Sequence, residues 1–337
     1  MKNSLFLGAM LSLSTLLVSC GNDKPKETAQ TSETAAPVEA AVKTPVFNAD
    51  SAYALIGKQV AFGPRTPGSP AQKKCAELLQ KELRNCCDTV YRQEVSVKGG
   101  DGKMLPCINL IGVIHPKAQH RILMLTHWDS RPWADKDTKD KDKPILAADD
   151  AGSGVGVLVE MAAKIKSFGL PDNIGVDILF EDVEDYGKEM WGENSYCLGT
   201  QYWAHNPHVP GYKADFGILL DMVGAHNALF KMESQSTNYA RDVQADVWKA
   251  AADAGFSSYF PYTDGGAITD DHIPVNQILG IKTIDIINLG GTMEQPFAPH
   301  WHTHNDNMSV IDKNTLKAVG QTLLQVVYST AARNKAS

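Results

Sequence analysis

The chain alternates short runs of consecutive apolar residues with longer stretches in which apolar residues recur at helical spacing. Five apolar runs rich in Ile, Leu and Val predict buried strands, at residues 107–115, 121–129, 173–182, 215–224 and 280–289. Three amphipathic stretches predict helices, at residues 153–169, 237–255 and 312–334. This alternation predicts an α/β fold: a single globular domain with a central mixed, mostly parallel twisted sheet and helices on both faces.

The N-terminal 45 residues differ in composition from the rest of the chain. An apolar run at residues 5–18 is too short to span a membrane and is typical of a secretory signal. It ends in LVSC, which resembles a lipobox, so we expect a lipoprotein signal peptide at residues 1–19 and a lipid on Cys20. Residues 20–45 have no aromatic side chain and predict a disordered tether. The folded domain would then occupy residues 46–337, in an exported protein that is lipid-anchored to a bacterial membrane and faces the periplasm or the cell surface.

Charge and cysteine content narrow the expected partners. The chain has 32 basic and 39 acidic residues, a formal net charge of −7, and its sequence has no basic stripe, so nucleic acid is not an expected partner. We expect membrane contact through the lipid alone, and a monomer. Five cysteines remain besides Cys20, and an odd number that includes the adjacent pair Cys86 and Cys87 predicts no disulfide framework.

Polar side chains with metal-binding or proton-transfer chemistry lie just past the predicted strands or before the first predicted helix. They are His127, Asp129, Asp149, Asp150, Glu184, Asp185 and Asp221. In open α/β sheets, residues in these positions usually form the site. A carboxylate from Asp149, one from the 184–185 pair and an imidazole from the cluster PHWHTHNDN (299–307) would give a catalytic zinc three ligands and an open position.

Each of these groups also has a purely structural explanation. Asp149 and Asp150 could cap the following helix and favour its dipole. Residues 181–185 could form a solvated acidic turn, His127 could be a core histidine, and residues 300–304 could be a surface loop. We favour a functional site, because without one all of these separate structural explanations would have to be true at the same time.

Six motifs, in this order, resemble the M28-type zinc aminopeptidases and, more closely, the glutaminyl cyclases that share their fold. They are HWDS, AADDAGSG, FEDVEDYG, LLDMVGA, DDHIP and WHTHND, and the resemblance extends from about residue 46 to the C-terminus. It implies a zinc-exopeptidase-like fold with one catalytic Zn²⁺ per chain, held by Asp149, Asp185 and His302. It also implies that Glu184 is the general acid/base and that Asp221 and Asp270 assist it.

The same resemblance implies a substrate pocket with an aromatic wall formed by Trp191, Phe297 and Trp301. The implied activity is that of a glutaminyl-peptide cyclotransferase, which converts the N-terminal Gln of peptides and exported proteins to pyroglutamate and releases ammonia. Glu184 would carry the proton from the attacking α-amine to the leaving nitrogen. His300 and His304 match no functional position, and we expect them to be loop residues.

An M28-type dizinc aminopeptidase is the alternative. Its second metal would bind His127 and Asp221, with Asp149 bridging, and Asp129 would lie at or beside that site. The Trp of WHT, the two Asp before His272 and the Trp after the acidic pair favour the cyclase. A catalytically silent peptide-binding lipoprotein is a third possibility, against which the presence of Glu184 argues.

Overall fold

The computed structural model describes residues 42–292 and 294–336. The expected signal peptide, the expected lipidation at Cys20 and the tether as far as residue 41 lie outside the described residues. The side chain of Gln321 accepts a hydrogen bond from the Phe47 N–H and donates one to the Pro45 carbonyl, both at 3.0 Å. Val42 packs against the core and Lys43 lies over the Phe168 ring, so contacts of the folded unit extend N-terminal to residue 46. Among the described helices, none is both long and apolar enough to cross a membrane.

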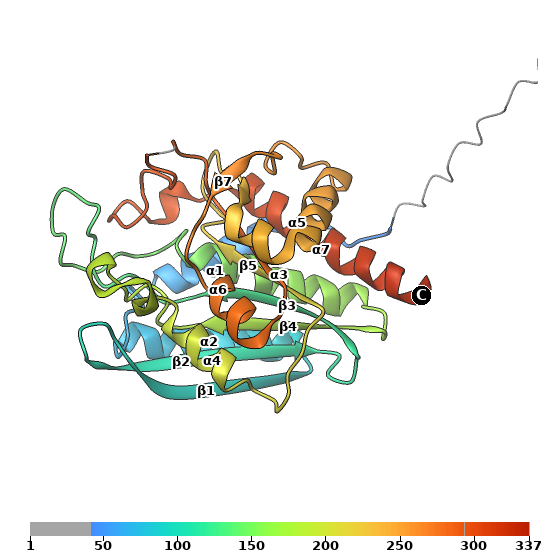
Figure 1. Ribbon diagram of the computed structural model, residues 1–337, viewed down its shortest axis with the longest axis horizontal. Coiled ribbons are helices and arrows are strands. Elements are labelled where there is room, and N and C mark those ends of the chain that lie inside the picture. The colour runs from blue at the N-terminus through green and yellow to red at the C-terminus, as the bar shows by residue number, and fades with distance from the viewer. Residues whose placement is uncertain (1–41, 293, 337) are drawn as a thin grey trace, which may run out of the picture. The chain divides into compact units, whose positions relative to one another are not determined.

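A six-stranded sheet forms the centre of the protein (Figure 1). The strand order is β1-β2-β4-β3-β5-β8; β1, β2 and β4 pair antiparallel, whereas β4, β3, β5 and β8 run parallel. The strands are β1 Thr89–Lys98, β2 Met104–Ile114, β3 His120–His127, β4 Ile174–Glu181, β5 Phe216–Asp221 and β8 Thr283–Ile287, with a separate short pair of β6 Met232–Glu233 and β7 Asp264–Gly266. The predicted mixed, mostly parallel sheet is confirmed.

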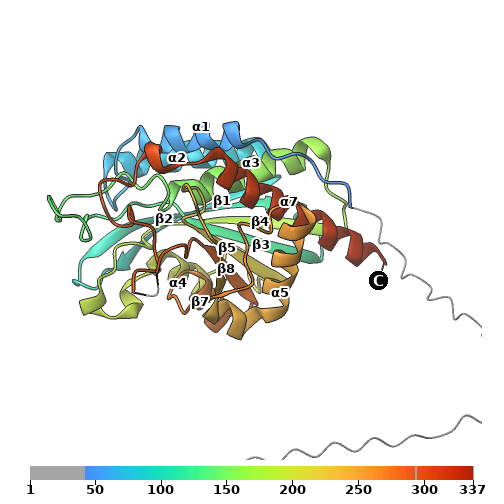
Figure 2. The same cartoon turned by 90° about the horizontal axis from the view of Figure 1, so that it is seen from above.

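Helices cover both faces of this sheet (Figure 2). On one face lie α1, α2, α3 and α7, and on the other lies α4, while α5 packs against α7 and the edge strand β8. The helices are α1 Ala49–Val60, α2 Pro70–Cys86, α3 Gly152–Phe168, α4 Leu198–His205, α5 Ser234–Asp253, α6 His272–Pro274 and α7 Lys313–Ala336.

The central strands contribute to two hydrophobic cores at once. In β3, Ile122 and Met124 belong to the core beneath α1, α3 and α7, whereas Leu123 and Leu125 belong to the core that contains Trp203 of α4. Successive side chains of a strand point to opposite faces, so a strand covered on both faces must be apolar throughout. This is why the strands appear in the sequence as consecutive apolar runs.

Three elements near the N-terminus were not predicted. β1 is an edge strand whose side chains are mostly half-buried or exposed, so it lacks a continuous apolar run. Both α1 and α2 begin with side-chain caps: Asn48 accepts from the Asp50 N–H, and Ser69 accepts from the Gln72 N–H with Pro70 at the first helical position. These capping signals are present in the sequence and could have identified both helices.

Arg65 fixes the loops that lead into the site. Its side chain is fully buried and donates to three backbone carbonyls: Nε to Trp128 at 3.1 Å, Nη1 to Leu146, and Nη2 to Ala147 at 2.8 Å. The first of these carbonyls lies just after β3, and the other two lie in the segment before α3. One guanidinium therefore joins the beginning and the end of the single segment that connects β3 to α3.

Replacing Arg65 by Met should lower the free energy of unfolding by about 3 kcal/mol, because three backbone carbonyls, two of them in buried contacts, would lose a charged donor. Unfolding in urea, monitored by circular dichroism, measures this change in the free energy of unfolding. Arg84→Met, at an exposed position of α2, is the matched control and should change stability by no more than about 0.5 kcal/mol. Equal effects of the two substitutions would contradict this role of Arg65.

Candidate active site

The carboxyl ends of the parallel strands bring the candidate residues to one edge of the sheet. His127 is the last residue of β3 and Asp221 the last of β5, while Glu184 and Asp185 lie in the turn after β4. The loop before α3 contributes its acidic pair, the segment before α6 contributes Asp270, and the loop between β8 and α7 contributes His302. The structure thus brings together segments that are up to 175 residues apart.

Asp150, Asp185 and His302 form a buried group in which one ligand atom of each residue lies within 4.8 Å of the others. His302 Nε2 lies 3.3 Å from Asp185 Oδ1 and 3.6 Å from Asp150 Oδ2. Asp185 Oδ2 is buried and has no hydrogen-bond partner among the described residues. Two carboxylates and an imidazole are a donor set that Zn²⁺ accepts, so these residues fit a catalytic metal centre.

The sequence predicted Asp149 for this group, and the structure places Asp150 there instead. The Asp149 carboxylate accepts a hydrogen bond from the Gly224 N–H at 2.8 Å and pairs with His300 Nε2 at 2.9 Å. These contacts direct it away from His302. Adjacent residues in a loop point in different directions, and no periodic pattern in the sequence shows which of the two faces the site.

Arg131 and Asp129 hold the acidic turn after β4 in place. Arg131 Nη1 donates to Asp185 Oδ1 at 2.7 Å, and the two carboxylate oxygens of Asp129 accept from the backbone N–H groups of Glu184 and Asp185 at 3.1 and 3.2 Å. Burial raises the pKa of Asp185, but His302 and Arg131 outweigh it and lower the pKa below its usual value. Asp185 is therefore held as a carboxylate, the form that binds a metal.

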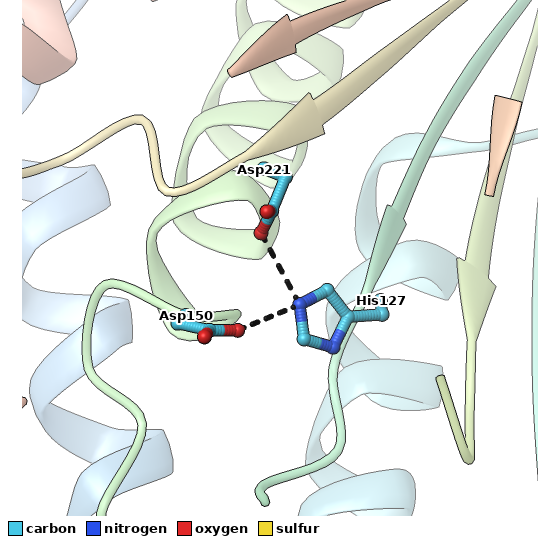
Figure 3. A group of neighbouring side chains, drawn as sticks. All are labelled: His127, Asp150 and Asp221. Carbon is cyan, nitrogen blue, oxygen red and sulfur yellow. Dashed lines mark hydrogen bonds and ion pairs between the residues drawn. The ribbon is translucent and has the colours of Figure 1, made fainter. Parts of the chain in front are cut away.

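His127 forms a second group with Asp150 and Asp221 (Figure 3). Its Nε2 lies 3.1 Å from Asp150 Oδ1 and 3.3 Å from Asp221 Oδ1, and its Nδ1 lies 3.2 Å from Asp129 Oδ1. Burial alone would lower the pKa of His127, but hydrogen bonds to these three carboxylates raise it well above its ordinary value. Asp150 is thus shared by both groups, which is the arrangement that the dizinc alternative requires.

Glu184 lies beside the first group with its side chain only 12% exposed. Burial, followed by the charge of Asp185, raises the pKa of Glu184 well above the usual value for glutamate. Oxygen atoms of Glu184 and Asp270 and the Sγ of Cys197 lie within 4.8 Å of one another, and Cys197 Sγ is 3.6 Å from Glu184 Oε1. Burial also raises the pKa of Asp221, to about 7. A carboxyl group with a raised pKa can both accept and donate a proton near neutral pH.

A narrow pocket of about 80 Å³ connects these groups. Its wall includes Phe297 and Trp301, whose ring centroids are 4.4 Å apart, and Trp301 stacks on His302 at 3.8 Å. Trp191, predicted for the same wall, is not among the lining residues and packs instead against Tyr186 and Trp133. The structure therefore brings two of the three predicted aromatic residues to the pocket.

Several residues of the site carried no sequence signal. Tyr196 lines the pocket, Cys197 contacts Glu184, and Arg131 binds Asp185. Tyr196 and Cys197 lie in the segment between β4 and α4, and Arg131 lies in the segment between β3 and α3. The contact between these segments is a tertiary one, which the spacing of residues in the sequence does not reveal. His300 and His304, expected to be loop residues, each have a carboxylate partner at 2.9 Å, in Asp149 and Asp137 respectively.

The chain belongs to peptidase family M28, whose family model matches residues 109–327. It is 46% identical to the glutaminyl cyclase of Bacteroides thetaiotaomicron, solved with bound N-acetylhistamine, with a TM-score of 0.82 over 85% of this chain and 99% of that chain. It is 48% identical to a Zn-dependent exopeptidase from Parabacteroides distasonis, with a TM-score of 0.81 and the same coverage. Among curated relatives, the glutaminyl-peptide cyclotransferase of Bos taurus is 23% identical in an alignment of 297 residues that covers 77% of this chain and 76% of that protein. The predicted zinc-exopeptidase-like fold and the resemblance to glutaminyl cyclases are confirmed.

The two adjacent aspartates should differ in their effect on metal binding. Asp150→Asn should weaken zinc binding by about 100-fold or more because it removes a charged ligand, whereas Asp149→Asn should weaken it by about tenfold or less because its Oδ1 can still accept from Gly224. Competition titration of zinc against a chromophoric chelator measures both affinities. The opposite ranking would assign the ligand to Asp149.

Proposed function

We propose that this protein is a glutaminyl-peptide cyclotransferase that uses one catalytic zinc. The observation that carries the proposal is that Glu184 shares one narrow pocket with Asp150, Asp185, His302 and an aromatic wall. The solved glutaminyl cyclase at 46% identity supports the same activity. The substrate would be a peptide or an exported protein that begins with Gln.

The reaction joins two groups of the same residue. The α-amine nitrogen of the N-terminal Gln attacks its γ-carboxamide carbon, the bond from that carbon to the amide nitrogen breaks, and ammonia leaves. Glu184 would accept the proton that the amine loses and deliver it to the departing nitrogen. Its raised pKa, with Cys197 and Asp270 beside it, suits a group that takes and returns a proton in one turnover.

Asp150, Asp185 and His302 would hold the zinc. When bound, the ion would act as a Lewis acid toward the γ-carboxamide oxygen. The unpartnered Asp185 Oδ2 supports this assignment, because a buried carboxylate oxygen without a partner costs stability unless a ligand fills the role. Arg131 and Asp129 would preserve the geometry of the ligand turn whether or not the ion is bound.

The aromatic wall would orient the substrate and exclude water. An intramolecular reaction needs no external nucleophile, so the enzyme gains most by folding the Gln side chain back toward its own amine. Phe297 and Trp301 provide flat apolar surfaces for the methylene groups of that side chain. Keeping water out also prevents hydrolysis of the amide to glutamate.

The contacts of His127 are compatible with a second metal. Its Nε2 lies 3.1 Å from Asp150 and 3.3 Å from Asp221, as close as His302 Nε2 lies to Asp185 in the first group. One zinc is proposed because the first group shares its pocket with Glu184 and because the chain is similar to a glutaminyl cyclase. The dizinc aminopeptidase remains the second candidate because Asp150 is shared by both groups and a similar structure is a Zn-dependent exopeptidase.

The cellular setting proposed for this activity rests on the N-terminal sequence. The apolar run and LVSC support export and lipid attachment at Cys20, with the catalytic domain on the outer side of the membrane that carries the lipid. We propose that the enzyme acts there as a monomer on peptides and proteins that have themselves been exported.

Replacing Glu184 by Gln should lower the turnover of a Gln-initiated peptide by about 10²- to 10⁴-fold, because the amide cannot shuttle a proton. Zinc-loaded wild-type protein and variant are compared by ammonia release under saturating peptide. Zinc affinity should change little, since Glu184 is not one of the three proposed ligands. Undiminished turnover would remove Glu184 from the mechanism, and release of Leu from a Leu-initiated peptide by the wild type would favour the aminopeptidase.

A further inference from the structure

Lys136 places an ammonium group beside the aromatic wall of the pocket. Its Nζ lies 5.3 Å from the centroid of the Trp301 ring, which is part of the pocket wall. Its backbone N–H donates to the His302 carbonyl at 3.3 Å. Both the backbone and the charged end of Lys136 are therefore anchored to the segment that contributes a candidate ligand and the aromatic wall.

Acidic residues in the same loop are already paired. Asp135 accepts from Arg131 Nε at 2.7 Å, and Asp137 accepts from the backbone N–H and Nδ1 of His304, both at 2.9 Å. The acidic partner of Lys136 is Glu189, at 3.7 Å and with its side chain 88% exposed. An exposed pair at that distance is weak and readily exchanged for another carboxylate.

Another lysine near the pocket is oriented differently. Lys188 Nζ lies 3.9 Å from the Trp133 ring and 5.3 Å from the Trp191 ring, so its ammonium faces aromatic surfaces that do not line the pocket. Lys136 instead holds its charge over Trp301, a ring of the pocket wall, and its side chain is 46% exposed.

The pocket wall itself offers no cation to an acidic side chain. Five carboxyl groups line it, from Asp150, Glu184, Asp185, Asp221 and Asp270. Arg131 and His127 are already paired with members of this set, so the wall can attract a substrate's α-amine but supplies no partner for a substrate carboxylate. Consecutive residues of an extended peptide are about 3.5 Å apart, so a Gln in the pocket leaves the next side chain at the mouth. A cation beside the wall, such as Lys136, would provide that partner when the next side chain carries a carboxylate.

We propose that Lys136 forms a subsite for the side-chain carboxylate of the residue that follows the N-terminal Gln. The ammonium would exchange its weak contact with Glu189 for a contact with Asp or Glu of the substrate. This inference rests on the proposed cyclotransferase function and names a class of preferred substrate, peptides that begin Gln-Glu or Gln-Asp.

The test compares kcat/KM for the peptides Gln-Glu-Ala, Gln-Ala-Ala and Gln-Lys-Ala by ammonia release. Wild-type protein should prefer Gln-Glu-Ala to Gln-Lys-Ala by about fivefold, the size expected for one exposed ion pair. Lys136→Met should abolish this preference, Lys136→Glu should reverse it, and Lys136→Arg should preserve it. Glu189→Gln should increase it, because the competing carboxylate is removed. The preference should also vanish near about 1 M salt, where the screening length falls to about 3 Å.

Lys141→Glu is the matched control. Lys141 is an exposed lysine farther along the same charged loop, and its reversal changes the net charge by the same amount as Lys136→Glu. It should leave the preference among the three peptides unchanged. An equal shift in both reversal variants would attribute the preference to net charge and overturn the subsite.

The remaining outcomes are distinct. A wild-type enzyme that cyclises all three peptides equally well, or a preference that survives in Lys136→Met, would overturn the subsite while leaving the proposed function intact. Absence of ammonia release from every Gln-initiated peptide would overturn the proposed function, and the subsite with it.

Discussion

Mutual repulsion among buried carboxyl groups is the constraint that this structure has to satisfy. Five of them share the wall of one small pocket: Asp150, Glu184, Asp185, Asp221 and Asp270. Burial raises the pKa of Glu184, Asp221 and Asp270, and neighbouring carboxylates raise it further. Cations at fixed positions offset the repulsion, since Arg131 pairs with Asp185 and His127 pairs with Asp150 and Asp221. A zinc ion would add the positive charge that this set of groups still requires.

The sheet makes such a cluster possible because the ends of its strands and the backbone of the adjoining turn determine where the acidic side chains lie. Parallel strands end at the same edge, and Asp129 accepts the two N–H groups of the turn after β4, so Glu184 and Asp185 are placed by main-chain contacts. From within the core, Arg65 binds both ends of the segment that connects β3 to α3. Because the backbone of Glu184 is held by Asp129, its side-chain carboxyl group is not needed to fix its position and is available for proton transfer.

The sequence predicted the central strands because burial on both faces of a sheet demands uninterrupted apolar runs, and it predicted α3, α5 and α7 from their amphipathic spacing. Asp185, His302, Glu184 and Asp221, which were predicted from the motifs that contain them, line one pocket in the structure. The sequence analysis predicted Asp149 in the candidate metal group, where the structure has Asp150. It also predicted Trp191 in the aromatic wall of the pocket, but Trp191 packs against Tyr186 and does not line the pocket. Those positions depend on side-chain directions within loops, which follow from tertiary contacts such as that between Asp149 and His300. The edge strand β1 was not predicted, because its side chains are mostly half-buried or exposed and it therefore has no continuous apolar run.

The central claim is that this buried acidic pocket directs an amine of the substrate, and not a water molecule, at the substrate's own amide. Mass spectrometry of a Gln-initiated peptide, incubated with the zinc-loaded protein in oxygen-18 water, tests it directly. The account predicts a product lighter by about 17 Da, the mass of one ammonia, with no heavy oxygen incorporated, because the attack is intramolecular. Incorporation of oxygen-18, whether into a deamidated peptide or at a newly cleaved carboxyl group, would contradict it.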